Sequence, residues 1–172
     1  MTNQVIGKSM FHGFAGDFSR QPDTIIDTHV AGGALAFGQG VVFSGDAVVT
    51  PGSSATAADF GGIVLRETKS ATNYLAQNVG SYVQYDAVPV LKRGCANVIC
   101  QNGTAAFDGD VYLRIAANAS LPNAVVGGFE AAADGANSVK LTNVKWKGAA
   151  DANGVAEVRI MTTTHAYKER RL

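Results

Sequence analysis

The stretch Val111-Tyr112-Leu113-Arg114-Ile115 alternates apolar and polar side chains with a period of two. Side chains of an extended strand point in turn to opposite faces, so this alternation predicts a strand with one apolar face and one polar face. Residues 155–160, near the C-terminal end, alternate in the same way. Both stretches therefore predict half-buried β-strands.

Short apolar segments separated by Gly, Asp, Asn and Ser recur from Thr24 onward. This pattern is typical of many short strands in a sandwich or barrel. Turn residues that tolerate positive φ stand between the segments, as at Asn102-Gly103 and Asn153-Gly154. The predicted strands cover residues 24–30, 40–43, 47–50, 62–66, 81–85, 88–91, 96–100, 111–116, 138–146 and 155–162.

One predicted strand changes phase, and one segment has no clear assignment. In residues 138–146 the apolar positions switch faces between Leu141 and Val144, which predicts a bulge. Residues 68–78 are the best helical candidate, but their Asn, Gln and Thr residues fit a long loop equally well. We therefore predict an all-β protein, a single-domain sandwich or barrel of about ten short antiparallel strands.

Composition divides the chain into three parts. Residues 1–23 are rich in Gly and Phe and follow no period of 2 or 3.6, so we predict an extended, irregular N-terminal arm there. Residues 24–164 are predicted to form the β domain, and residues 165–172 a basic C-terminal tail. At 172 residues, the chain is long enough to bury one sizeable core.

Charge and hydropathy limit the partners that we expect. The 14 Lys and Arg residues balance 14 Asp and Glu residues, so there is no basic surplus for binding nucleic acid. No run approaches the roughly 18 apolar residues of a membrane span, and the first residues lack the pattern of a signal peptide, so we expect a soluble protein and no membrane partner. A surface with few charges and no net charge guards poorly against association, which indicates protein partners.

Two segments supply candidate residues for protein contacts. The phenylalanines of the arm need an apolar surface, which is either the domain's own core or that of a neighbour. The basic tail is either solvated or docked on an acidic neighbouring subunit. The candidate contact residues are Phe11, Phe14, Phe18, Tyr167, Arg170 and Arg171.

No motif for phosphate, dinucleotide or zinc binding is complete. Residues 7–9 (Gly-Lys-Ser) lack the earlier glycine of a phosphate loop, because Thr2 occupies that position. Residues 38–40 (Gly-Gln-Gly) begin a dinucleotide fingerprint, but Phe43 stands where its third glycine belongs. The three histidines, His12, His29 and His165, stand at no ligand spacing.

The remaining reactive side chains have ordinary structural explanations. Asp108, Asp110 and Asp134 each stand close to a glycine in a turn, where Asp usually bonds its own backbone rather than calcium or a second carboxylate. Cys95 and Cys100 would point to opposite faces of one strand, so we expect reduced thiols. We predict no catalytic residue, no metal site and no cofactor.

A series of strand-and-turn phrases carries a resemblance to a known family. The phrases are residues 14–17, 27–28, 37–42, 60–66, 88–94, 109–114, 127–129 and 154–160. In order and spacing they resemble the tailed-phage capsid decoration proteins, also called structural cement proteins. Such pieces are scaffold in that family, so the resemblance carries over no functional residue.

The resemblance implies a mechanical function. It implies a non-enzymatic protein that binds the outer surface of an icosahedral phage head and stabilises the expanded capsid by bridging major capsid subunits. The implied partners are the major capsid protein and further copies of this chain, with a trimer preferred over a dimer, and with no nucleic acid or membrane. The implied location is the virion, after synthesis in the bacterial host cytoplasm.

Two other functions remain open at this point. One is a virion-displayed adhesive or glycan-binding β-module, in which an exposed Trp146 would stack on sugar rings, and a buried Trp146 would count against it. The other is an enzyme whose site assembles only in space. A cleft lined by paired carboxylates, or by a histidine and a carboxylate, would favour the enzyme.

Overall fold

A computed structural model describes residues 11–66 and 80–162, apart from the side chains of residues 21 and 22. Residues 1–10 of the predicted arm, the helical candidate at 68–78 and the whole predicted tail lie outside the described residues. The division of the chain into arm, domain and tail therefore stays a prediction.

The described residues form β-strands and two short 3-10 helices, η1 (Ala57–Asp59) and η3 (Gly135–Asn137), which confirms the predicted all-β class. The strands are β1 (Phe18–Ala31), β2 (Leu35–Ala36), β3 (Gly40–Ser44), β4 (Ala47–Val49), β5 (Phe60–Val64), β6 (Ser81–Tyr82), β7 (Ala87–Ile99), β8 (Asp110–Arg114), β9 (Phe129–Glu130), β10 (Ser138–Trp146) and β11 (Val155–Ile160).

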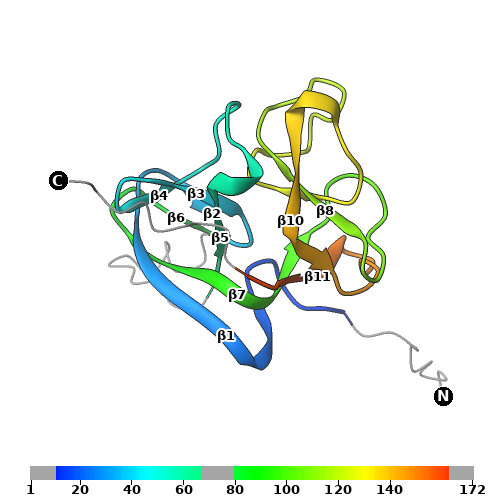
Figure 1. Ribbon diagram of the computed structural model, residues 1–172, viewed down its shortest axis with the longest axis horizontal. Coiled ribbons are helices and arrows are strands. Elements are labelled where there is room, and N and C mark those ends of the chain that lie inside the picture. The colour runs from blue at the N-terminus through cyan, green and yellow to red at the C-terminus, as the bar shows by residue number, and fades with distance from the viewer. Residues whose placement is uncertain (1–10, 67–79, 163–172) are drawn as a thin grey trace, which may run out of the picture.

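Two hydrogen-bonded rings of strands share β7. The main sheet has the order β1-β4-β3-β5-β7-β11-β10-β8-β9, and a further pairing of β1 with β7 closes the first five strands into a first ring. Strands β11, β10, β8 and β9 form a second ring with β7, which is closed by a bridge between Cys100 and Phe129, while β2 and β6 pair in a separate two-stranded sheet. In Figure 1 the first ring lies on the left and the second on the right, with β7 running between them. Because β7 belongs to both rings, it joins them into one body. Closure of each ring also leaves few free strand edges in the described part of the chain.

Strand β7 is longer than predicted, because Gly94 does not end it. The sequence pattern places separate strands at 88–91 and 96–100, whereas β7 runs without a break over 13 residues. Gly94 has a φ of +119°, and a Cβ there would come within 2.7 Å of the Asp23 carbonyl oxygen of β1. The glycine therefore permits a close strand contact rather than a turn.

Strand β1 also differs from the prediction. It begins at Phe18 rather than Thr24, and it pairs in parallel with β4, with Val30 opposite Ala47. The other pairings of the main sheet are antiparallel. A period of two reports which face a side chain occupies but not the direction of the neighbouring strand, so the sequence could not reveal this pairing.

Strand β7 contributes side chains to both hydrophobic cores. Val88 and Val90 belong to the core of the first ring, and Ala96 and Val98 to the larger core that the second ring encloses. The register against β1 shifts between these pairs, with Lys92 as the extra residue. A bulge of this kind exchanges the two faces of a strand, so one strand can serve two cores.

The second ring confirms two predictions about local pattern. Val111, Leu113 and Ile115 of β8 and the loop after it are buried, as their alternation predicts. The pairing of β10 with β8 shifts register between Leu141 and Lys145, which confirms the predicted bulge. The bulge keeps apolar side chains from both halves of β10 in one core.

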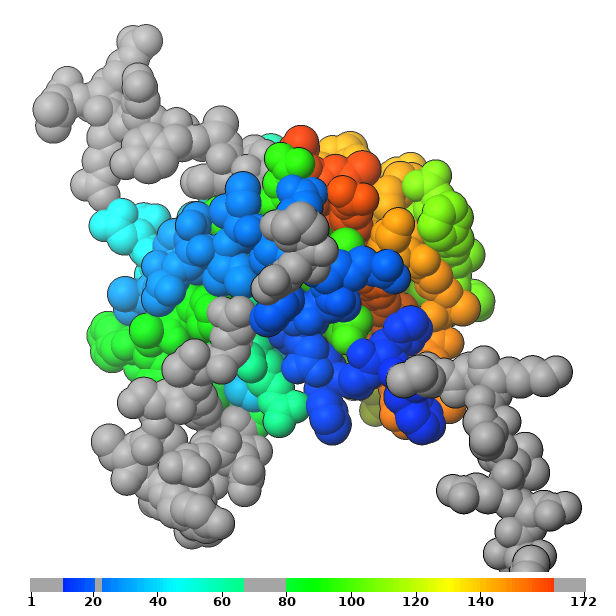
Figure 2. Space-filling model, turned by 90° about the horizontal axis from the view of Figure 1, so that it is seen from below, coloured from blue at the N-terminus to red at the C-terminus, as the bar shows by residue number. Residues whose placement is uncertain are grey.

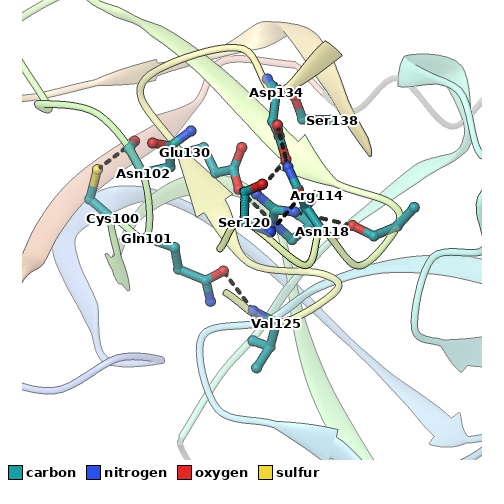
Figure 3. A network of polar contacts seen from close by, with 11 residues as sticks. Cys100, Gln101, Asn102, Arg114, Asn118, Ser120, Val125, Glu130, Asp134 and Ser138 are labelled. Atoms are coloured by element: carbon teal, nitrogen blue, oxygen red, sulfur yellow. Dashed lines mark hydrogen bonds and ion pairs between the residues drawn. The ribbon is translucent and has the colours of Figure 1, made fainter. Parts of the chain in front are cut away.

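The opposite face of β8 is buried as well, so the prediction of a half-buried strand is wrong at Arg114. This side chain is fully buried, and its Nε donates to Glu130 Oε1 at 2.6 Å (Figure 3). Its Nη2 pairs with Asp134 at 2.9 Å, and Asn118 Nδ2 donates to both oxygens of Asp134. Residues 116–137 fold back over this face, so the guanidinium meets carboxylates instead of water.

Candidate protein-contact surface

Residues 11–20, called here the N-terminal segment, lie across the outer face of the second ring. Figure 2 shows this part of the chain, in dark blue, crossing the face seen from below. Asn97 of β7 is its central support: the Asn97 amide donates to Asp17 O at 2.8 Å, Asn97 O accepts from the Gly16 amide at 2.9 Å, and Asn97 Nδ2 donates to His12 O at 2.5 Å. Asn97 is itself buried beneath the segment.

His12 is fastened to the loop before β11. Its backbone amide donates to Asp151 Oδ2 at 2.9 Å, and its Nε2 lies 3.2 Å from Ala149 O. The hydrogen bond from the His12 amide, together with those from the amides of Val155 and Asn153, lowers the pKa of Asp151. Asp151 therefore stays ionised at neutral pH and orders both its own turn and the start of the N-terminal segment.

Residues 14–17 (Phe-Ala-Gly-Asp) form a tight turn in the middle of the segment. Asp17 Oδ2 accepts from the Phe14 amide at 3.0 Å, and Gly16 has a φ of +88°. A Cβ on Gly38 would come within 2.9 Å of the Gly16 nitrogen, so the two backbones touch. Gly16 O also accepts from the Arg66 amide at 2.9 Å, which ties the turn to the end of β5.

The far end of the segment is held by one buried carboxylate. Glu157 Oε1 of β11 accepts from Ser19 Oγ at 2.6 Å and from Arg20 Nε at 2.6 Å, and its Oε2 accepts from Arg20 Nη2 at 3.0 Å. These contacts, like those of His12 and residues 14–17, are polar. The N-terminal segment is therefore held by polar contacts that leave Phe11 and Phe14 mostly exposed.

The phenylalanines of the segment face solvent instead of a core. Phe11, Phe14 and Phe18 are 67%, 66% and 37% exposed. The segment thus folds back on its own domain, but it does so through polar contacts that leave Phe11 and Phe14 mostly exposed. Phe14 lies under the Arg66 guanidinium, 4.8 Å from its ring centroid, and the side chain of Ile99 is exposed on the same face of β7 as Asn97. The segment presents a pre-ordered apolar surface of the kind that protein contacts use.

Some of these supports could be recognised in the sequence and others could not. The Phe-Ala-Gly-Asp turn has a clear signature, since Gly tolerates positive φ and Asp accepts from nearby amides. Asn97 and Glu157 interrupt apolar strands and give no sign of a partner about 80 to 140 residues away. Of the six predicted contact residues, Tyr167, Arg170 and Arg171 lie outside the described residues.

Other candidate side chains have structural roles. Asp108 lies in a turn with a φ of 59°, as its glycine neighbour indicates. Asp110 and Asp134 do not follow the backbone-bonding prediction, because Asp110 pairs with Lys140 and Lys145, and Asp134 pairs with Arg114. Cys95 and Cys100 are free thiols that form no disulfide bond.

Three further observations bear on the alternatives. Trp146 is fully buried in the core of the second ring, so it cannot stack on a sugar, which counts against the glycan-binding alternative. Within residues 11–66 and 80–162, no group of three His, Cys, Asp or Glu side chains is placed to hold a metal ion. Helices long and apolar enough to cross a membrane are lacking in the same part of the chain.

Comparisons with known proteins point to one family and to a similar solved structure. The family model described as "Structural cement protein (E217 gp24/Pam3 gp6)" matches residues 1–161. A chain in the solved structure entitled "The capsid of Myoviridae Phage XM1" has the same fold, with a TM-score of 0.67 and 19% identity over 94% of this chain and 98% of that chain. A search of curated proteins found no match.

Proposed function

Since the chain belongs to the structural cement protein family, we propose that it binds the outer surface of an icosahedral phage head and stabilises the expanded capsid. The family is one of structural capsid proteins, and the fold matches that of a chain in a phage capsid. The finer points of the proposal are the contact residues, the bridging of shell subunits and the number of copies.

The proposal rests on three exposed phenylalanines of the N-terminal segment, whose backbone is held in place by hydrogen bonds. A flexible arm would lose conformational entropy on binding, whereas residues 11–20 are already held by Asn97, Asp151 and Glu157. Phe11, Phe14 and Phe18 can therefore enter apolar pockets of the shell at a small ordering cost.

The architecture suits a bridge between neighbouring shell subunits. Packed genome strains an expanded shell from within, and a clamp resists this strain only if it does not stretch. The two rings share one continuous strand, β7, so tension between them would have to break strand pairing. We further propose that copies of the chain associate, because linked binding sites make later contacts intramolecular, and we prefer a trimer over a dimer.

The test is decoration of expanded heads that lack this protein. Heads are mixed with the wild-type chain or with the triple variant Phe11→Ser, Phe14→Ser and Phe18→Ser, and binding is measured by co-sedimentation and cryo-EM. The wild type should add density to the outer face between major capsid subunits, and the triple variant should bind at least tenfold more weakly, about 1.4 kcal/mol or more.

The matched control is Phe107→Ser. Phe107 is also an exposed phenylalanine, but it lies in the turn before β8, outside the N-terminal segment. Its removal should leave head binding unchanged, and unchanged fluorescence of Trp146 should show that each variant is folded. Equal binding by the triple variant and the wild type would remove residues 11–20 from the contact, and bare heads would contradict the proposed function as a whole.

A further inference from the structure

An exposed apolar patch lies at the start of β7, on the first ring. It consists of Val30, Val83 and Tyr85, and is called here the Tyr85 patch. The Tyr85 amide donates to Ala31 O at 2.8 Å, and Val30 lies opposite Ala87 in the pairing of β1 with β7. Backbone contacts thus bring the end of β1 and the turn before β7 together.

Tyr85 is held in an unfavourable backbone conformation on this patch. Its φ is +73°, which a bulky residue rarely adopts, and its side chain is 80% exposed. The turn is closed by a hydrogen bond from the Asp86 amide to Val83 O, and the Val83 amide donates to Asp86 Oδ2. Glycine or asparagine would adopt this conformation at a lower cost, so an exposed tyrosine here indicates a contact made by the ring.

The surroundings of the patch are acidic. Residues 24–65 and 80–91 contain no Lys or Arg but four carboxylates, which are Asp27, Asp46, Asp59 and Asp86. Two of them flank the patch. Asp86 follows Tyr85 directly, and Asp46 precedes Ala47, which lies opposite Val30. A partner that covers the patch would therefore gain from positive charge beside an apolar or aromatic group.

The second ring carries a surface of the opposite charge. Four cationic side chains of β7, β10 and β11 are called here the basic face, and they are Arg93, Lys140, Lys145 and Arg159. Asp110 pairs with both lysines and Asp23 with both arginines, at distances of 2.5 to 3.2 Å. The cations are 29% to 51% exposed, and they outnumber the carboxylates that they pair with by two.

Strand register places the basic face on one side of the sheet. Lys145 lies opposite Arg159, and Arg159 lies opposite Cys95, two positions along β7 from Arg93. Residues directly opposite each other, and residues two positions apart in a strand, point to the same side. Ile25 lies opposite Arg93, beyond the end of the N-terminal segment, and is 49% exposed. The basic face therefore has an apolar side chain beside a guanidinium, a pair on which an aromatic ring can stack.

The two surfaces cannot meet within one molecule. Ala87, at the patch, and Arg93, on the basic face, lie about 20 Å apart along one continuous strand. Two Tyr85 patches would also pair poorly, because the Asp46 and Asp86 carboxylates of both copies would meet, and two basic faces would bring cations together. Opposite charges meet when the patch of one copy faces the basic face of another.

We propose that the Tyr85 patch of one copy docks on the basic face of the next copy, head to tail. The Tyr85 ring would pack on Ile25 and stack on the Arg93 guanidinium, and Asp46 and Asp86 would lie beside the cations. A two-fold dimer needs the same surface on both copies, whereas unlike surfaces can close into a ring of three. This docking rests on the proposed association of copies, for which it names the surfaces, and does not depend on head binding.

Variants of the full chain that block one surface each test the docking without phage heads. The patch variant is Asp46→Lys with Tyr85→Asn, because asparagine tolerates the positive φ at this position. The face variant is Arg93→Gln with Lys140→Glu, which leaves one cation beside each carboxylate of the basic face. Oligomeric state is measured by analytical ultracentrifugation and native mass spectrometry. Unchanged fluorescence of Trp146 should show that each variant is folded.

The wild type should associate, and each variant alone should associate at least tenfold more weakly, about 1.4 kcal/mol or more. A mixture of equal amounts should form a one-to-one heterodimer, because the patch variant keeps its basic face and the face variant keeps its patch. Labelling one variant with 15N identifies the heterodimer by its mass. The matched control is Val125→Asn, which removes an exposed apolar side chain outside both surfaces and should leave association unchanged.

The other outcomes separate the docking from the proposals on which it rests. Association of the face variant with itself would show that patch meets patch, and association of the patch variant with itself would show that face meets face. Either result, or a mixture without heterodimer, would overturn the head-to-tail docking and leave the association of copies standing. A monomeric wild type would overturn both. Head binding is measured separately, by the decoration of expanded heads.

Discussion

Arg20 and Glu157 meet across 137 positions of the sequence through hydrogen bonds of 2.6 and 3.0 Å, and they differ sharply in burial. The Arg20 side chain is 66% exposed, whereas that of Glu157 is 7% exposed. Burial acts to raise the pKa of Glu157, but the hydrogen bonds from Arg20 and Ser19 outweigh it, so the pKa lies below its ordinary value. The exposed partner therefore keeps the buried one charged.

This difference in burial predicts that loss of the exposed Arg20 side chain lowers the free energy of unfolding more than neutralising the buried Glu157 does. Arg20→Met leaves a buried carboxylate without its cation and should lower the free energy of unfolding by about 1–3 kcal/mol. Glu157→Gln keeps an acceptor for Ser19 and leaves Arg20 in water, so it should cost less. Urea unfolding followed by the fluorescence of Trp146, the single tryptophan, measures both. A larger loss for Glu157→Gln would contradict this account.

Gly62 is predicted to be irreplaceable where β5 pairs with β7. Its φ is +140°, and a Cβ would come within 2.4 Å of Leu91 O. Gly62→Ala should therefore destabilise the protein by more than about 1 kcal/mol, or prevent folding. The control is Gly52→Ala, because a Cβ there meets nothing within 4 Å. Thermal unfolding of the two variants should separate them clearly, and similar unfolding temperatures would contradict the close contact.

The ion pair inside the second ring is predicted to be strongly coupled. Arg114→Met leaves the buried Glu130 carboxylate without its cation, and Glu130→Met leaves a buried guanidinium paired with Asp134 alone, so each should cost about 3–5 kcal/mol. The double variant replaces both charges by apolar side chains and should cost much less than the sum. A double-mutant cycle from urea unfolding measures the coupling, and additive losses would show that the two residues act independently.

Asp110 is predicted to make stability depend on pH in the acid range. Hydrogen bonds from Lys140 and Lys145 lower its pKa to about 2. Because the folded pKa lies below the unfolded value of about 4, the stabilisation is complete above about pH 4 and is lost as the pH falls through about 2. The difference in stability between wild type and Asp110→Asn should therefore shrink over this range. A difference that is constant between pH 5 and pH 2 would contradict the assignment.

The burial of strand residues and the position of a bulge could be predicted from the sequence, because both depend on neighbouring residues. The period of two at Val111, Leu113 and Ile115 predicted their burial, and the phase change after Leu141 predicted the bulge in β10. Each of these statements concerns which side of one strand faces the core. They required no knowledge of the neighbouring strand.

Contacts between distant parts of the chain could not be predicted from the same local patterns. Gly94 stands between the two strands predicted at 88–91 and 96–100, yet it lies inside β7, because only the approach of β1 shows why a glycine is needed there. Arg114 has the signature of an exposed residue, yet it is buried, because residues 116–137 bring Glu130 and Asp134 over it. In both cases the deciding contact comes from a distant part of the chain.

The sequence by itself determined the all-β class, the positions of most strands and the absence of a basic surplus, since these follow from local periodicity and composition. Only the tertiary structure decided that β1 and β5 close a ring with β7, and that Phe11, Phe14 and Phe18 face outward. The physical reason is that the residue type alone does not specify whether a phenylalanine packs into its own core or into a pocket of a partner. Its environment is decided by the polar contacts of Asn97, Asp151 and Glu157, which hold the backbone so that the rings remain in solvent.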